Sequence, residues 1–211
     1  MVITYHGLEF VKITFGDITI AFNPVSKSSD YKSSSFGADM AFISLNDPDF
    51  NGWQSLARGE KEPFVINGPG EYEFRGVFVR GFPSFSSYKN KKRPNTFYNV
   101  ILEETSICFL GAISSENIKD HLNALEEEVD ILFIPIGGDG VLSAAEAYKT
   151  AVGLESKIII PIHFNFNGDK NSLKTFLKEG GEENLKPVEK LSLRKKDLVG
   201  KQGEIVVLSQ G

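Results

Sequence analysis

Apolar and polar residues alternate along most of the first half of the chain. The alternation has the two-residue period of a half-buried β-strand, and Gly16-Asp17 supplies a turn between two such runs. Further strand-like runs continue to Gly111, with hairpin turns expected at Arg75-Gly76 and Glu104-Thr105. The first three expected strands are residues 2–5, 9–15 and 18–22. The pattern predicts a first half rich in sheet.

The pattern changes to alternating helix and strand from about residue 115. Residues 114–129 carry apolar side chains at Ile118, Leu122 and Leu125, the spacing of an amphipathic helix. Residues 130–136 and 157–163 are nearly continuous apolar runs, which is typical of strands buried on both faces. A helix is expected to start at a capping box formed by Ser143 and Glu146, and another at 170–179. This mixture predicts an α/β fold with two layers of sheet covered by helices.

Composition narrows the class of protein. A chain of 211 residues can bury one substantial core, so a single domain over 1–211 is the simplest organisation. Its apolar content of 41% and charged content of 24% are ordinary for a globular protein. The net charge of −5 argues against nucleic acid as a partner.

Cysteine usage and hydropathy exclude further classes. Cys108 is the only cysteine, so a disulfide framework and a thiolate zinc cluster are both excluded. The N-terminal alternation is a hairpin pattern and differs from a signal peptide. No apolar stretch approaches the roughly 20 residues that span a bilayer. We therefore expect a cytoplasmic protein without membrane contact.

The stretch "FISLNDPDFNG", residues 42–52, is the first candidate site. Asp47 and Asp49 follow directly after an apolar strand, where active sites of α/β proteins are often built. With Asn46 and solvent, these carboxylates could bind a hard cation. Alternatively, Asn46-Asp47-Pro48 forms a turn in which a side chain caps nearby backbone amides. The residues alone leave both interpretations open.

Two other segments suggest ligand binding. The glycine-rich loop "IGGDG" runs into the capped helix at Ser143 and could offer backbone N–H groups to an anion, although Asp139 would repel one. The basic stretch "YKNKKRPNTFY", residues 88–98, could contact nucleic acid, but a solvated loop explains its charge more simply.

Several collinear segments resemble the metallo-β-lactamase superfamily, in particular its small branch similar to the ascorbate-6-phosphate lactonases. The resemblance covers about residues 2–165. It implies a four-layer αβ/βα sandwich with the active site along the edge between the sheets. The segments that carry it are "ITYHGLEFVKITFGDITIAFNP", "INGPGEYEFRGVFVRGFPS", "NTFYNVILEETSICFLG", "VDILFIPIGG" and "AAEAYKTAVGLESKIIIPIHF".

The resemblance also implies a metal site that this chain retains only in part. Active members carry His-x-His-x-Asp-His after the strand, a bridging Asp and a final His, because imidazole suits zinc, manganese or iron and the metals generate hydroxide. Here Asp49 matches the motif's Asp and His163 the final ligand, while Asp47 replaces a His and Ala112 the bridging Asp. Leu45 and Phe50 stand at the remaining His positions of the motif. With three histidines in the chain, a five-His site is excluded.

These departures lead to two competing functional expectations. The first is an inactive binding or scaffold module with no cofactor, a vestigial site formed by Asp47, Asp49, His163, Asn46 and Ala112, and an unknown small molecule or protein as its partner. The alternative is a metal-dependent hydrolase, lactonase-like or phosphodiesterase-like, with one zinc or manganese ion at an Asp-rich site built from Asp47, Asp49 and His163.

Overall fold

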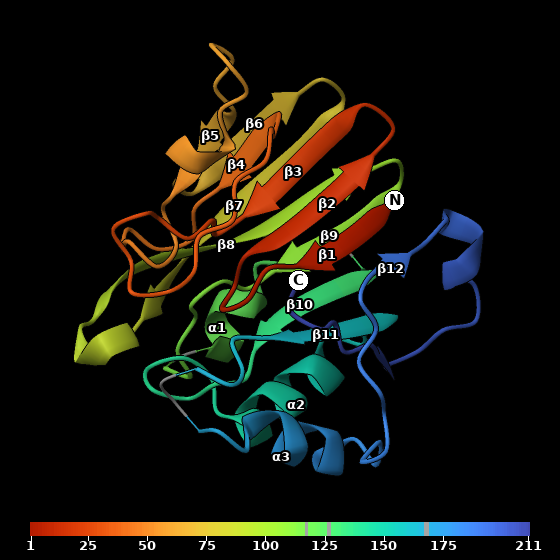
Figure 1. Cartoon of the computed structure of the whole chain (residues 1–211). Coiled ribbons are helices and arrows are strands. Elements are labelled where there is room, and N and C mark those ends of the chain that lie inside the picture. Colours follow the sequence, from red (N-terminus) through yellow and green to blue (C-terminus); the bar gives the residue numbers. More distant parts are fainter. Residues whose placement is uncertain (117, 126–127, 167–168) are drawn as a thin grey trace.

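The computed structural model describes residues 1–116, 118–125, 128–166 and 169–211 and shows two sheets packed face to face (Figure 1). Within these residues, the first sheet has the strand order β12-β1-β2-β3-β4-β5. Its strands β1 to β3 are antiparallel, whereas β4 and β5 continue parallel to β3. The strands are β1 (Val2–Tyr5), β2 (Val11–Phe15), β3 (Ile18–Phe22), β4 (Met40–Phe42), β5 (Phe64–Ile66) and β12 (Leu191–Ser192).

The second sheet has the order β13-β11-β10-β9-β8-β7-β6 in the described part of the chain. Strands β6 to β9 are antiparallel, and β9, β10, β11 and β13 are parallel. They are β6 (Gly70–Phe74), β7 (Val77–Ser86), β8 (Arg93–Leu102), β9 (Thr105–Phe109), β10 (Ile131–Pro135), β11 (Ile158–Ile162) and β13 (Glu204–Ile205).

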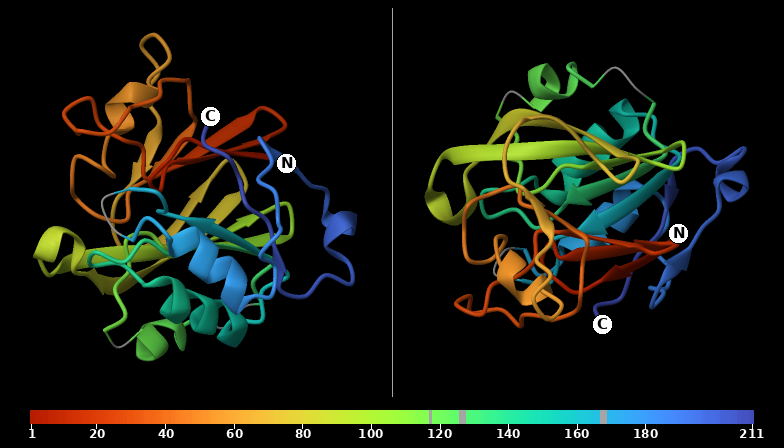
Figure 2. Two further views of the ribbon diagram at one scale, coloured as in Figure 1. Left: turned by 60° about the horizontal axis from the view of Figure 1, so that its bottom comes forward. Right: turned by 90° about the horizontal axis from the view of Figure 1, so that it is seen from above.

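Helices cover the outer face of the second sheet (Figures 1 and 2). They are α1 (Ile118–Leu122), α2 (Ala144–Gly153) and α3 (Ser172–Glu179). Short 3₁₀ turns occur at η1 (Trp53–Leu56), η2 (Tyr88–Asn90) and η3 (Lys195–Leu198). No helix in the described ranges is both long and apolar enough to cross a membrane.

Aromatic side chains fill the space between the two sheets. The Phe22 ring lies 4.7 Å from that of Phe42 and 4.6 Å from that of Phe109, measured between ring centroids. Because strand side chains alternate, Ala21 and Ala41 face the other way and pack in a second buried cluster with Leu56. The alternation in the sequence therefore separates the two faces of the first sheet.

The structure confirms the α/β sandwich, and most of the expected elements occur. The turn expected at Glu104-Thr105 lies one residue earlier, because Glu103 and Glu104 take positive φ of 46° and 58°, as a tight two-residue hairpin turn requires. The helix expected over 114–129 is described only as α1; residues 117, 126 and 127 of that range lie outside the described residues. The capping box at Ser143 and Glu146 is confirmed.

The carboxyl ends of parallel strands from both sheets meet at one edge. Asn23 and Ser44 follow β3 and β4 of the first sheet, and Ala112 and His163 follow β9 and β11 of the second. The backbone N–H of His163 donates to Leu8 O, and the side chain of Asn23 bonds to Ser44, so loops from both sheets are in contact there. This edge is where ligands bind in open α/β sheets.

Candidate active site

The loop after β4 folds into a tight turn around Asp47. The backbone N–H groups of Phe50 and Asn51 donate to Asp47 O at 2.8 Å and 3.0 Å. The N–H of Asp49 donates to Asp47 Oδ1 at 3.2 Å. The turn interpretation of this segment is therefore confirmed. Both carboxylates are nevertheless buried, with Asp47 7% and Asp49 2% exposed.

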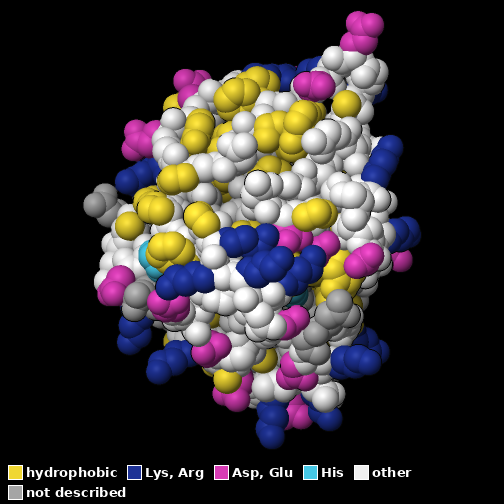
Figure 3. All heavy atoms as spheres, turned by 90° about the vertical axis from the view of Figure 1, so that its left-hand side faces the viewer, with side chains coloured by type: hydrophobic (Ala, Val, Ile, Leu, Met, Phe, Trp, Pro, Cys, Tyr) yellow, Lys and Arg dark blue, Asp and Glu magenta, His cyan; other side chains and the backbone are white. Residues whose placement is uncertain are grey.

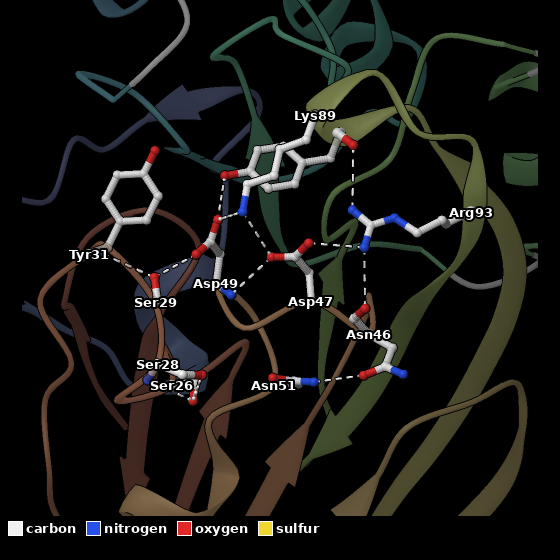
Figure 4. A network of polar contacts seen from close by, with 11 residues as sticks. Ser26, Ser28, Ser29, Tyr31, Asn46, Asp47, Asp49, Asn51, Lys89 and Arg93 are labelled. Atoms are coloured by element: carbon white, nitrogen blue, oxygen red, sulfur yellow. Dashed lines mark hydrogen bonds and ion pairs between the residues drawn. The ribbon is translucent and has the colours of Figure 1, made fainter.

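Two basic side chains, Lys89 from the β7–β8 connection and Arg93 from the start of β8, neutralise these carboxylates (Figure 4). Lys89 Nζ lies 2.7 Å from Asp49 Oδ2 and 3.2 Å from Asp47 Oδ1, so both carboxylates converge on one ammonium. Arg93 Nη1 donates to Asp47 Oδ2 at 2.9 Å and to the carbonyl of Asn46 at 3.3 Å. The prediction of a solvated loop at residues 88–98 is therefore wrong for Lys89 and Arg93. Both side chains pair with buried carboxylates, which need counter-charges.

The ion pairs shift the pKa values of the groups that form them. Burial raises the pKa of Asp47, but the N–H of Asp49, Arg93 and Lys89 outweigh it, so the pKa lies below its ordinary value. For Lys89, burial lowers the pKa, and the bonds to Asp49 and Asp47 raise it above the ordinary value. The shifts therefore keep Asp47 and Lys89 charged at neutral pH.

Hydroxyl groups complete the surroundings of Asp49. Tyr88 Oη donates to Asp49 Oδ2 at 2.8 Å, and Ser29 Oγ donates to Asp49 Oδ1. Burial, followed by the hydrogen bond to Asp49, raises the pKa of Tyr88, which keeps the phenol protonated as a donor. Lys89 reaches the carboxylates from a left-handed backbone conformation with φ of 55°. The β7–β8 connection thus folds over the aspartates.

His163 belongs to a different polar network at the same edge. Its Nδ1 lies 2.6 Å from Glu9 Oε1, and Asn23 Nδ2 donates to Glu9 Oε2 at 2.7 Å. Asn23 Nδ2 also donates to Ser44 Oγ at 2.7 Å, and the N–H of Ser44 donates back to Asn23 Oδ1 at 2.8 Å. Glu9 and Asn23 are fully buried. This network links the loops that follow β1, β3, β4 and β11.

Two aromatic rings lie between the aspartates and His163. The ring of Tyr88 contacts that of His163 at 5.5 Å and that of Phe50 at 4.9 Å. Phe50 is fully buried, as is Ala112, whose N–H donates to Ser44 Oγ at 3.4 Å. The single site expected from Asp47, Asp49 and His163 is therefore divided into two adjacent polar networks.

Sequence reasoning missed Glu9, Tyr88, Lys89 and Arg93 as site residues. Glu9 had one available signal, since it is an acidic residue between Leu8 and Phe10 in an otherwise apolar stretch. The basic stretch carried no signal that singled out two of its cations. In the glycine-rich loop, the chain itself takes the anion position considered at the start of α2, because the carboxylate of Glu146 accepts from the N–H of Ser143 at 2.9 Å.

The kinds of side chain gathered at this edge limit which metal ion it could hold. Among the described residues, no group of three or more His, Cys, Asp or Glu side chains lies close enough to hold a metal ion. The imidazole-rich site implied by the family resemblance therefore does not fit. Asp47 and Asp49 converge on a single cation position, which the Lys89 ammonium occupies.

Comparisons with known sequences connect this fold to hydrolases. The model of the family described as "Beta-lactamase superfamily domain" matches residues 2–163. A relative from Bacillus mycoides (strain KBAB4), named UPF0173 metal-dependent hydrolase, is 24% identical over 203 residues, covering 78% of this chain and 86% of its own. A relative of the same name from Geobacillus sp. (strain WCH70) is 22% identical, covering 92% of this chain and all of its own.

Solved structures share the fold over nearly the whole chain. One from Thermotoga maritima, described as a Zn-dependent hydrolase of the metallo-beta-lactamase superfamily, has a TM-score of 0.76 and 24% identity, covering 99% of this chain and 98% of its own. An isothiocyanate hydrolase from Delia radicum gut bacteria has a TM-score of 0.65 and 11% identity, covering 100% and 97%. At these identities the likeness concerns the fold.

These relatives correct two expectations drawn from the sequence. The prediction of an inactive binding or scaffold module is wrong, because the relatives are named metal-dependent hydrolases and favour the alternative. The prediction that no cofactor is involved is wrong for the same reason. Both errors have the same origin. The chain lacks most of the family's histidine ligands, and we took this absence to mean that the hydrolytic chemistry was lost as well.

Proposed function

Since the chain belongs to the beta-lactamase superfamily, we propose that it is a metal-dependent hydrolase acting at the edge where Asp47 and Asp49 lie. The relatives' name supports the reaction class. The observation that carries the proposal is the convergence of two buried carboxylates on one cation position directly after β4. That is the position in the fold where the family resemblance implies the metal.

Asp47 and Asp49 are the residues that would hold the ion, through carboxylate oxygen. A divalent cation there would supply a water molecule with a lowered pKa. Lys89 has to leave this position first, and its side chain, 46% exposed at the tip of a hairpin, has solvent to move into. Arg93 is only 24% exposed and stays with Asp47 on the other side of the carboxylate. Ion uptake would thus replace the Lys89 ammonium by a metal ion between the carboxylates of Asp47 and Asp49.

The charge around the site favours an anionic substrate. Lys91 is exposed, and Lys92 is 54% exposed and pairs with Glu116. Figure 3 shows basic side chains gathered in the middle of the face toward which the β7–β8 connection points. Once Lys89 is released from the aspartates, its ammonium adds to this positive surface. We therefore propose an ester bearing negative charge, either a phosphodiester or a lactone with an anionic group.

Metal uptake tests this proposal directly. The full chain is dialysed against manganese or zinc, and the metal content is measured by plasma mass spectrometry. We expect about one ion per chain in the wild type and a loss in Asp49→Asn. Asp39→Asn is the matched control, because Asp39 lies directly before β4, at its other end, and pairs with Lys61 and Arg75.

Hydrolysis is then measured on bis-p-nitrophenyl phosphate and on a phosphorylated lactone. Turnover that disappears with chelator and with Asp49→Asn, and persists in Asp39→Asn, supports the proposal. A wild-type chain that takes up no ion, or whose turnover is unaffected by Asp49→Asn, overturns it.

A further inference from the structure

Strand β6 forms an open edge of the second sheet. It lies last in the strand order, and no strand pairs with its outer side in the described part of the chain. Among the outer strands described, β12 and β13 have two residues each and β5 has three, whereas β6 has five. Short outer strands, prolines and lysines protect sheet edges from pairing, and β6, with the sequence GEYEF, has none of these features. The backbone of β6 can therefore take up a further strand.

Aromatic rings line the inner side of this edge. Tyr72 pairs with Val79 across β7 and Phe74 with Val77, and both valines are buried in the core. Phe74 stacks on Phe64 of β5, with the ring centroids 5.1 Å apart and 5° between the planes, so the outer strands of the two sheets lie side by side (Figure 1). Phe64 is nevertheless 40% exposed. A strand added to β6 would bury this apolar surface with the side chains that it turns inward.

Carboxylates line the outer side of the same edge. Glu71 and Glu73 alternate with the aromatic residues and are exposed, and Arg80 Nε lies 3.7 Å from Glu71 Oε1. Beside them lies a groove of about 240 Å³, whose lining includes Glu71, Arg80, Phe78 and Ile101. Phe78 is 55% exposed. A lysine or arginine of an added strand could lay its alkyl stem against Phe78 and keep its charged end at the carboxylates.

The charge of this edge selects among possible partners. Glu103 and Glu104 are exposed in the turn that follows Ile101, and Ile101 pairs with Phe78, so they add negative charge at the same end of the sheet. A second copy of β6 would set its own glutamates against these, and like charges opposite one another destabilise a strand pair. Basic side chains opposite the glutamates stabilise it instead. The edge therefore favours a positively charged strand.

We propose that the β6 edge binds an extended segment of a partner protein in which basic and apolar side chains alternate. The segment adds a strand to the second sheet. Its apolar side chains pack against Phe64 and Phe74, and its lysines or arginines face Glu71 and Glu73. The inference uses none of the residues of the proposed hydrolase site and is independent of it.

Defined synthetic peptides test the proposal on the full chain. One peptide alternates Lys and Val, a second has the same composition with Lys and Val in two separate blocks, and a third alternates Glu and Val. Binding is followed by NMR of the ¹⁵N-labelled chain. We expect the alternating Lys peptide to shift the amide signals of β6 and to slow their hydrogen exchange, as a new strand does. Binding of the block peptide should be about 10-fold weaker or absent, and the Glu peptide should not bind.

Charge reversal on the exposed side of β6 tests the recognition. In a variant with Glu71→Lys and Glu73→Lys, judged folded by its amide spectrum, the alternating Lys peptide should bind about 10-fold more weakly and the Glu peptide should now bind. The matched control combines Glu182→Lys and Glu183→Lys, exposed residues just after α3 with the same change in net charge, and should bind as the wild type does.

Three results would overturn the proposal. The first is equal binding of the alternating and block Lys peptides, or binding without protection of the β6 amides, which would mean charge attraction without strand addition. The second is unchanged binding in the charge-reversed variant. The third is self-association of the chain in sedimentation that the same charge reversal abolishes, because a second copy would then occupy the edge.

Discussion

Replacing Lys89 by methionine removes the cation on which Asp47 and Asp49 converge while keeping a side chain of similar length. The variant retains Arg93, which still pairs with Asp47 at 2.9 Å. Asp49 loses its ion pair with Lys89 at 2.7 Å and, among the described residues, keeps hydroxyl partners alone on its side chain. Two buried carboxylates then share one counter-charge. The change therefore tests whether the ammonium stands in for a metal ion.

The expected cost follows from the contacts. Removing one partner of a buried charge pair costs about 3–5 kcal/mol, and the half-exposed position of Lys89 reduces this to about 2 kcal/mol. For a chain of 211 residues this lowers Tm by about 4–8 °C. An ion that binds only the folded state at 100 times its Kd adds about 2.7 kcal/mol. Manganese should thus restore the stability that the substitution removes.

The same cost weakens metal binding to the wild type. Because the ion must displace Lys89, its Kd should be about 30-fold larger in the wild type than in Lys89→Met, the equivalent of about 2 kcal/mol. Isothermal titration with manganese and thermal melts with and without the ion measure both effects. Lys91→Met is the matched control, because Lys91 is exposed and forms no ion pair with another described residue.

The pH dependence provides a second check on the same variant. The pKa of Asp47 is lowered in the folded state, so its stabilisation is present above the unfolded pKa of about 4 and is lost as pH falls through the folded value. The deficit of Lys89→Met should be full at pH 7 and shrink below about pH 4. Two results would refute the reasoning. In the first, manganese does not restore the stability lost in Lys89→Met; in the second, manganese stabilises Lys91→Met as much as Lys89→Met.

Two further predictions concern the scaffold. Asp130 accepts a hydrogen bond from Lys157 Nζ at 2.6 Å and pairs with Lys195 at 3.2 Å. Burial raises the pKa of Asp130, but these two cations and a backbone N–H hold it below the ordinary value. Asp130→Asn should therefore lower the free energy of unfolding in urea by about 2–3 kcal/mol at pH 7. The difference from the wild type should diminish below about pH 4, and an equal loss at both pH values would contradict this. Ser143→Ala removes the capping hydroxyl of α2 and should cost about 1 kcal/mol, whereas no loss in a thermal melt would mean that Glu146 caps the helix alone.

Local patterns in the sequence predict most of the fold. The two-residue alternation around Gly16-Asp17 places β2 and β3, because a strand turns successive side chains to opposite faces. The capping box at Ser143 and Glu146 marks the start of α2, since both partners lie within one helical turn. Such signals can be read because each depends on residues only a few positions apart.

The candidate site was predictable only in its location. The turn at Asp47 and the strand end before it follow from adjacent residues, whereas His163 was identified from the family resemblance, in which it matches the final ligand. Whether the aspartates face a metal, solvent or another side chain depends on what reaches them from elsewhere. The sequence alone left a cation site and a capping turn open for the aspartates, and it favoured a solvated loop at residues 88–98.

The sequence by itself determined the strands, the turns, the cap of α2 and the edge at which polar residues collect. Tertiary structure alone decided that Lys89 pairs with Asp49, 40 positions away, and that Glu9 pairs with His163, 154 positions away. The physical reason is that a buried charge must be neutralised by whatever group the packed sheets bring within reach, and that distance is set by the folded chain as a whole.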